Sequence, residues 1–445
     1  MTTYVRTMRQ LHALPGLADV PDYSRILSRA EAVLSFGEKV VKAAESEGSV
    51  VLDDVALSLP NRLKTTRTTL GISRAEAAQR VGFSEAEIRL LEDAGVSSPF
   101  WKLDRYAQVL GLEGTSVGDA PDVVQSRFKE SQLSPTGDRL SSTEATQLQK
   151  AVLEARWVGL MYVQLLTLRG RHPDMPRFST DYGAADSKSK KPFQVGHELA
   201  KALRKQWQVA NGPIVSMSGL CEQHGIPIVV VDLPSQFNSV LIALPKARVI
   251  AVSDRLVRTR VLSARVAIAH EIGHLHDPGT KLDVLRLERS ELEHAAQIQY
   301  TNRDHVESRA GAFGAYLLAP QAQLRNYVEK IDKLGIAEII AGVSSWWGMS
   351  FFAVRDHIWN NVRDVCPPDR ASMLEGAHQG SQLLASHLEE FPGLNVKDLR
   401  VSRAGAFARL VRECLHAQLI SRRSAQSMLA LSDEGCVDDV LGALP

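Results

Sequence analysis

The stretch "AIAHEIGHLHD" (residues 267–277) places two histidines four residues apart, with a glutamate directly after the first. On an α-helix, residues i and i+4 share a face, so His270 and His274 would project in the same direction. Two imidazoles at this spacing can bind one Zn²⁺, and Glu271 beside them can take a proton from a water that the metal activates. Zinc lowers the pKa of such a water from about 15.7 to about 7. The stretch therefore predicts a catalytic zinc site for amide hydrolysis.

The alternative is a structural polar turn in an apolar helix. The chain contains 13 histidines, and H-E-x-x-H arises by chance in roughly one protein of this size in a hundred. The preceding "VLSARVAIA" (261–269) is apolar apart from Ser263 and Arg265, which predicts a largely buried helix. Burying two imidazoles and a carboxylate without a partner is costly, and a metal ion removes that cost. The context thus favours the metal site.

A catalytic zinc usually takes three protein ligands, so a third ligand is expected after the motif. We favour Glu307, which opens the segment "ESRAGAFGAYLLAP" (307–320). Gly311 and Gly314 leave one side of this predicted helix thin, so it could approach the metal helix closely. The less favoured candidates are His276, Asp277, His294, Asp304 and His305.

Composition and charge narrow the class of protein. The chain has 445 residues, 44% of them hydrophobic, with 52 lysines and arginines against 51 acids. This balance favours neither nucleic acid nor a membrane surface, so any DNA binding must be local. We recognise neither a signal-peptide core nor a membrane span of roughly 18 apolar residues, so we expect a soluble, cytoplasmic protein without membrane association. The four cysteines show no C-x-x-C spacing, which indicates reduced thiols.

Changes in residue composition and hydrophobic pattern along the chain predict a multidomain α+β protein. The predicted parts are an N-terminal helical segment (1–59), an all-α helix-turn-helix domain (60–113), a linker (114–149), an α+β domain (150–360) and an all-α C-terminal region (361–445).

Three strand-like runs occur in the α+β domain, at residues 226–232, 239–244 and 248–253. The last two are close enough for a hairpin, and one of them could be an exposed edge that pairs with an extended substrate. A purely structural role in the core is equally compatible with their apolar side chains. The candidates for an oxyanion donor are His276, His305 and Tyr316, with none preferred.

Three segments of the sequence together resemble the ImmA/IrrE metallopeptidases of bacteria and phages. They are "LCEQHGIPIVVVDLP" (220–234), "VAIAHEIGHLHD" (266–277) and "VESRAGAFGAYLLAP" (306–320), and the resemblance covers about residues 150–360. It implies a minimal zincin-like fold and cleavage of a cognate transcriptional repressor, which derepresses stress or mobile-element genes. Carried over by position, it also implies zinc ligands and a general base: His270, His274 and Glu307 as ligands, with Glu271 as the base.

The chain departs from that family's pattern after the third ligand. The family commonly has Ala-Asn and then Phe-Ala, where this chain has glycines at 311 and 314. Each glycine costs about 1 kcal/mol against alanine in a helix interior, so the local shape of this helix is expected to differ.

A second motif precedes the linker. "SRAE" (73–76) and "SEAE" (84–87) are capping boxes, so two short helices should begin after Ser73 and Ser84, separated by Gly82. This is the helix-turn-helix arrangement, in which the second helix enters the major groove. Together with "SPFWKLDRYAQVLGL" (98–112), the segment resembles the phage-repressor (XRE-type) family. That resemblance implies binding to double-stranded DNA, usually as a dimer.

The charges of the second helix work against DNA binding. Four acids stand against one arginine in residues 84–95, which opposes the phosphate attraction that dominates affinity. Basic residues that could contact phosphates lie mostly on the flanking helices: Arg62, Lys64, Arg67, Arg74, Arg80 and Arg89. DNA binding is the favoured use, and protein docking or dimerisation is the alternative.

The sequence thus predicts a zinc-dependent endopeptidase acting on a small helix-turn-helix repressor, with a helix-turn-helix unit of its own for DNA or a partner. A homodimer is compatible with it. The alternative is a DNA-binding regulator or antitoxin-like protein whose zincin fold is a non-catalytic scaffold or sensor. Glu271 distinguishes the two, because a scaffold needs the metal ligands but not the base.

Overall fold

The computed structural model describes part of the 445-residue chain. The described residues are 28–47, 60–61, 63–68, 72–93, 98, 102–103, 106–107, 110, 142–171, 191–244, 247–276, 286–289 (backbone only), 305–362, 364–365, 370–385, 405–429 and 437. The chain divides into two compact units. One comprises residues 1–173, 244–247 and 403–445, and the other comprises 174–243 and 248–402.

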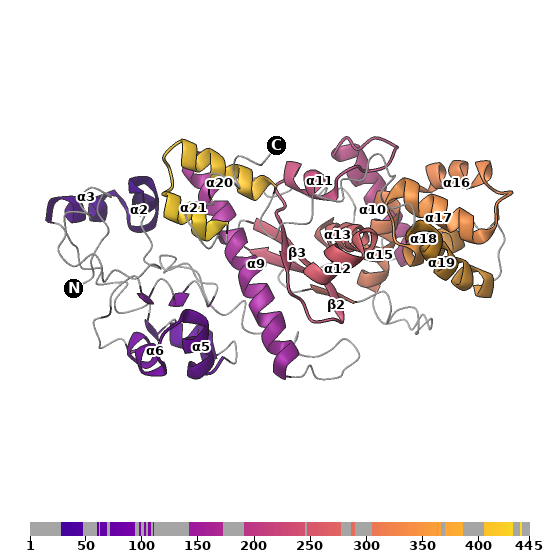
Figure 1. The fold of residues 1–445 in the computed structure, drawn as a ribbon. Coiled ribbons are helices and arrows are strands. Elements are labelled where there is room, and N and C mark those ends of the chain that lie inside the picture. The colour runs from indigo at the N-terminus through magenta and orange to yellow at the C-terminus, as the bar shows by residue number, and fades with distance from the viewer. Residues whose placement is uncertain are drawn as a thin grey trace. The chain divides into compact units, whose positions relative to one another are not determined.

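The first unit is helical in its described part. Its helices are α2 (Arg29–Phe36), α3 (Glu38–Glu47), α5 (Arg74–Val81), α6 (Glu85–Leu91), α9 (Ser142–Leu168), α20 (Ala406–His416) and α21 (Arg422–Met428) (Figure 1). Both predicted capping boxes are present: the Ser73 and Ser84 side chains accept from the third residue of α5 and α6. The turn between the two helices uses Gly82 at φ 79°, a backbone conformation that favours glycine.

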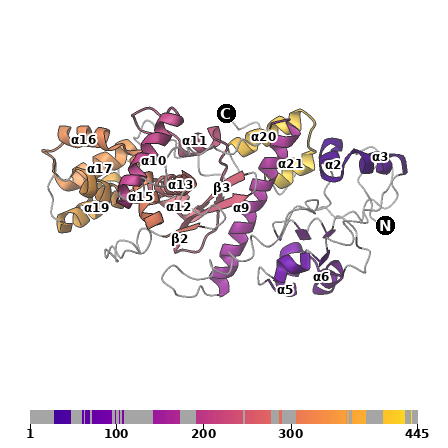
Figure 2. The same cartoon turned by 180° about the vertical axis from the view of Figure 1, so that it is seen from behind.

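Segments from the two ends of the chain meet on α9. The α20 helix packs along α9, and the Cys414 thiol lies 3.7 Å from the Leu165 carbonyl oxygen, to which it donates (Figures 1 and 2). The backbone amide of Ser421 donates to the Glu31 carboxylate, 3.2 Å away, which holds α2 against the loop between α20 and α21.

These contacts differ from the predicted domain boundaries. The α9 helix, expected to open the α+β domain at residue 150, belongs to the first unit and begins at Ser142, inside the predicted linker. The predicted C-terminal region is divided, because α19 (Arg370–Ala385) packs on α17 (Ile336–Trp347) in the second unit whereas α20 packs on α9. Helix composition alone does not reveal which apolar faces meet.

The second unit contains a small sheet and a helical group. The remaining elements are α10 (Pro192–Gln206), α11 (Met217–Gln223), β1 (Ile228–Val231), β2 (Phe237–Leu244), β3 (Ala247–Ser253), α12 (Asp254–Thr259), α13 (Val261–His276), β4 (Arg286–Arg289), α15 (His305–Leu318), α16 (Gln321–Lys330) and α18 (Phe351–Asn361). Figure 1 shows α12 and α13 by the sheet, and α16 to α19 gathered beyond α15. This mostly helical architecture with a mixed sheet confirms the α+β class.

The strands lie in the order β1-β3-β2-β4. The β1 strand pairs parallel to β3, and β2 pairs antiparallel to β4, with Val240 opposite Leu287. The expectation that residues 248–253 form the edge is therefore wrong, because β3 lies between β1 and β2. On β2, the pairing with β4 covers residues 237–241 and does not extend to residues 242–244. The sequence of β4, "RLER", has no apolar alternation that would predict a strand.

Buried side chains from the sheet and from α10, α13, α15, α17 and α18 form one hydrophobic cluster. Nearly all of α13 is buried, and β2 and β3 are buried along almost their whole length, so the H-E-x-x-H motif sits in a rigid interior. Within the described residues, no single helix is long and apolar enough to cross a membrane, although α17 and α18, bent by 107°, pass that test as a pair.

Candidate metal centre

The two histidines of the motif meet at one point. Both lie on α13, one turn apart, and their Nε2 atoms are 2.9 Å from each other. His270 is 8% exposed and His274 is 1% exposed. The shared helix face that the i, i+4 spacing predicts is therefore present, and it is directed into the protein rather than to its surface.

Glu307 completes the cluster from the first turn of α15. Its Oε2 atom lies 3.0 Å from Nε2 of His270 and 3.3 Å from Nε2 of His274. Two ligands on a tetrahedral zinc, with bonds of about 2.0–2.2 Å, lie about 3.3 Å apart. The three side chains therefore form a cluster that could hold one metal ion.

The two histidines favour the ionised form of the Glu307 carboxylate. Burial raises its pKa, but hydrogen bonds and charge interactions with His270 and His274 outweigh that effect and hold the pKa well below its ordinary value. The group thus keeps the negative charge that a metal ligand needs, even beside two largely buried rings.

The less favoured ligand candidates lie elsewhere or outside the described residues. The His276 ring stacks on Phe313 and meets Trp207 edge to face, and burial lowers its pKa to about 3. His305 is exposed at the start of α15. Tyr316, a candidate oxyanion donor and not a ligand candidate, has its ring against that of His197, with the centroids 5.0 Å apart. The other three candidates, Asp277, His294 and Asp304, lie outside the described residues.

Two glycines bring α13 and α15 into backbone contact. A Cβ at Gly314 would lie 3.0 Å from the backbone nitrogen of His270, and one at Gly273 would lie 3.0 Å from Cα of Ala310. The thin face predicted for α15 is thus formed at Gly314 but not at Gly311, where a Cβ would meet nothing within 4 Å. Gly273 was not predicted, although a glycine inside an apolar helix is a signal for close packing.

We expect Gly314→Ala and Gly311→Ala to act in opposite directions. The first adds a methyl group against the His270 backbone, so it should push α15 away, lower the free energy of unfolding and weaken metal binding. The second should raise the free energy of unfolding by about 1 kcal/mol, because alanine favours a helix interior. Denaturant unfolding and zinc titration of both variants measure this, and equal zinc affinity would show that the crossing does not set the ligand geometry.

Glu271, the predicted base, is fully buried and directly follows His270 on α13. Its Oε1 atom accepts a hydrogen bond of 2.7 Å from the hydroxyl of Ser239 on β2. Ser239 was not predicted from the sequence. The available signal was a polar residue inside the apolar run "FNSVLIAL" (237–244), since a buried hydroxyl needs a partner.

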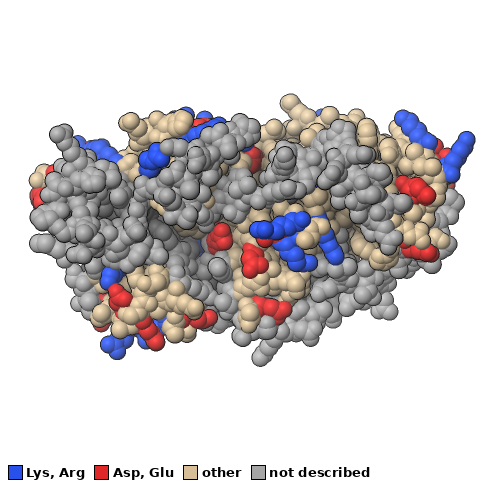
Figure 3. All heavy atoms as spheres, viewed as in Figure 1, with Lys and Arg blue, Asp and Glu red and all other residues tan. Residues whose placement is uncertain are grey.

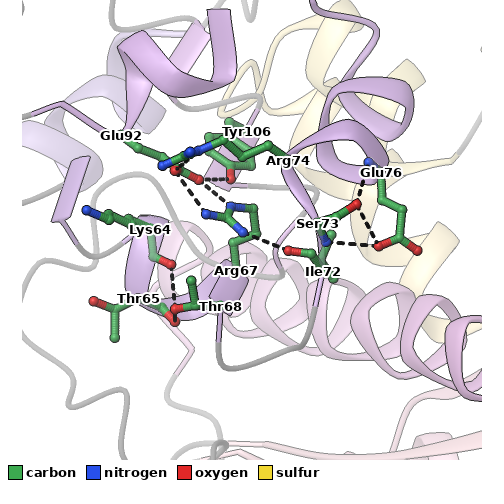
Figure 4. Close-up of polar contacts among 10 residues, drawn as sticks. All are labelled: Lys64, Thr65, Arg67, Thr68, Ile72, Ser73, Arg74, Glu76, Glu92 and Tyr106. Carbon is green, nitrogen blue, oxygen red and sulfur yellow. Dashed lines mark hydrogen bonds and ion pairs between the residues drawn. The ribbon is translucent and has the colours of Figure 1, made fainter. Parts of the chain in front are cut away.

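The helix-turn-helix unit has a buried ionic centre (Figure 4). The Arg67 guanidinium donates to both oxygens of Glu92 and, over 2.8 Å, to the Ile72 carbonyl oxygen. The Glu92 carboxylate also accepts from Tyr106 at 2.7 Å and from Arg74 at 2.9 Å. Arg67 is 7% exposed and Glu92 is 4% exposed. This arrangement ties α6 to the residues before α5.

The ionic centre argues against one predicted phosphate contact. Arg67 is buried and bonded to Glu92, whereas Arg74 donates to Glu92 through Nε and its side chain is 35% exposed. Lys64 and Arg89 are exposed. Arg62 and the side chain of Arg80 lie outside the described residues. In Figure 3, the region of α5 and α6 shows basic and acidic side chains side by side, and the compact group of Lys and Arg on this face lies elsewhere, near the centre of the view.

We expect Glu92→Ala to destabilise the helix-turn-helix unit by roughly 3–5 kcal/mol, because removal of one partner leaves a buried charge uncompensated. Glu85→Ala, which removes an exposed carboxylate of the same helix, should change stability by no more than about 0.5 kcal/mol. Amide hydrogen exchange of α5 and α6 gives the local free energy of opening. Equal exchange in both variants would contradict a stabilising role for the ionic centre.

The same centre predicts a pH dependence. Burial raises the pKa of Glu92, but hydrogen bonds from Arg67, Tyr106 and Arg74 prevail, so the pKa lies below its ordinary value. A lowered folded-state pKa adds stability that is fully present above the unfolded value of about 4.3. This contribution to the free energy of unfolding should be lost as the pH falls through the folded-state pKa of Glu92. In Glu92→Ala, the free energy of unfolding should no longer show this decrease at low pH.

A scan of the chain against protein-family models found no match, and neither did a search of curated proteins.

Proposed function

We propose that the chain is a zinc-dependent endopeptidase of the ImmA/IrrE type, with His270, His274 and Glu307 as metal ligands and Glu271 as general base. The main support is that the three potential ligand atoms lie within 4.8 Å of one another. Glu271 directly follows the first of these ligands on α13. Two imidazoles and one carboxylate are a ligand set found in catalytic zinc sites, which leave a fourth position open.

The metal and Glu271 have different roles in the proposed reaction. Zinc, when bound, supplies Lewis-acid activation of water and of the substrate carbonyl. Glu271 accepts the proton that the attacking water loses, and it returns that proton to the amide nitrogen as the C–N bond breaks. Burial keeps the Glu271 carboxylate in a low-dielectric setting, where its interactions with a transition state are stronger than in water.

Glu307 is the most exposed side chain of the cluster. It is 38% exposed, whereas the side chains of His270 and His274 are 10% and 1% exposed. We therefore expect a substrate to reach the cluster at Glu307 rather than at the buried histidines. The proposed substrate class, a small helix-turn-helix repressor, comes from the family resemblance.

The test is direct incubation of the zinc-loaded chain with repressors encoded by neighbouring genes. We expect two new fragments by mass spectrometry, lost after chelation and restored by added zinc. Fragments that are insensitive to chelation would contradict the metal mechanism. Metal binding without cleavage of any such repressor would favour the alternative, a regulator or antitoxin-like protein with a zincin scaffold.

For the helix-turn-helix unit, the surface of α6 favours a protein partner over DNA. Leu90 is 46% exposed. Its exposed neighbours include Glu85 and Asp93, with Arg89 as the exposed base. Acidic groups repel phosphates, whereas an exposed leucine among charges suits a protein surface.

Fluorescence anisotropy with promoter DNA at two salt concentrations separates these uses. We expect weak or no binding. Tight binding, with a salt slope that falls by about 0.9 for each phosphate ion pair that Lys64→Glu or Arg89→Glu removes, would establish DNA as the partner instead.

A further inference from the structure

We propose that Ser239 is the positioning residue for the general base, fixing the orientation of the Glu271 carboxylate in the resting protein. This inference rests on the proposed function, because it assigns a role within the same reaction. It adds a residue from the sheet to a site otherwise built from two helices.

The contact joins two rigid elements. Ser239 and Glu271 are both 0% exposed, and the Ser239 hydroxyl donates to Oε1 of Glu271 over 2.7 Å. The Ser239 backbone is held in the β2–β4 ladder opposite Glu288. The Glu271 backbone is held in the buried part of α13. Neither end can move without disturbing the core, so the hydroxyl meets the carboxylate in one place.

A glutamate that acts as a general base needs such a contact because its carboxylate rotates easily. Its terminal torsion is broad, so a carboxylate without a fixed partner samples many orientations. A hydroxyl that donates to one oxygen restricts this rotation and thereby fixes where the second oxygen lies. A general base must reach the proton that it removes to within about 2.6–3.2 Å, so a fixed second oxygen favours transfer.

The chain offers a matched control on the neighbouring strand. Ser253 on β3 is also a buried strand serine, 1% exposed. Its hydroxyl has no hydrogen-bond partner within the described part of the chain. The change of serine to alanine at 253 therefore removes the same atom from the same sheet without touching Glu271.

The experiment compares Ser239→Ala, Ser239→Thr and Ser253→Ala in the zinc-loaded full chain. The substrate is the intact repressor that the wild-type protein cleaves. We expect Ser239→Ala to lower kcat about 10- to 100-fold, comparable to the cost of losing a hydrogen-bond partner of a metal ligand. KM, zinc affinity and melting temperature should stay close to wild type. Ser239→Thr should restore most of the activity because it keeps the hydroxyl, and Ser253→Ala should match wild type.

Two outcomes would overturn the proposal. One is unchanged kcat in Ser239→Ala. The other is a joint loss of kcat, zinc affinity and melting temperature that threonine does not rescue, since this would indicate a structural role.

Failure of the proposed function is distinguishable, since the wild type would then cleave nothing. In that case the probe is acetohydroxamate, titrated into the cobalt-substituted protein and followed by visible absorption. A hydroxamate chelates the metal and hydrogen-bonds to a correctly oriented carboxylate. Weaker binding by Ser239→Ala than by Ser253→Ala would support the positioning role, and equal binding would overturn it.

Discussion

Glu271→Gln should abolish repressor cleavage while the fold and the bound zinc are retained. Glutamine has the same shape and can still accept the Ser239 hydrogen bond through its amide oxygen. It cannot take a proton from water, and loss of a positioned base typically costs about 10² to 10⁴ in rate. The measurements are kcat for the repressor that the wild-type protein cleaves, zinc content by elemental analysis and the circular dichroism spectrum.

The comparison between Glu271→Gln and Ser239→Ala sharpens this prediction. The first removes the proton acceptor, and the second removes only the group that orients it. We therefore expect the larger loss from Glu271→Gln, with zinc content equal in both. Unchanged turnover in Glu271→Gln would remove this residue from the chemistry, and zinc loss in the same variant would make it a metal-site residue instead.

Glu307→Ala should weaken zinc binding more than a hundred-fold. Four-ligand zinc sites bind with about 10–16 kcal/mol, so one ligand is worth on the order of 3 kcal/mol. The Glu307 carboxylate is also the negative group of the cluster, 3.0 Å from His270 and 3.3 Å from His274. Competition with a chromophoric chelator measures the affinity of wild type and variant.

His305→Ala is the matched control for this second prediction. His305 is an exposed, potential ligand on the same turn of α15 and is not part of the cluster. Its removal should leave zinc affinity within about two-fold of wild type, a change worth less than about 0.5 kcal/mol. If His305→Ala lost zinc and Glu307→Ala did not, the third ligand would have to be reassigned.

Several elements of this protein could be predicted from neighbouring residues alone. The face shared by His270 and His274 follows from helical spacing, and the starts of α5 and α6 follow from serine and glutamate three residues apart. Glu307 could be singled out because small residues follow it in the same helix. In each case the physical cause acts within one or two helical turns, so a short window of sequence contains it.

Other features depend on which surfaces meet after folding. The sequence suggests that Arg67 is exposed and available to phosphate, yet it is buried and bonded to Glu92, 25 residues away. Gly311 and Gly314 look alike, and only the crossing with α13 gives Gly314 its role. The pairing of Ser239 with Glu271 joins a strand to a helix across 32 residues. Sequence determined the helix that carries His270, Glu271 and His274. Tertiary packing determined the partner of its base, because burial leaves a polar group to bond only with the surfaces that folding brings against it.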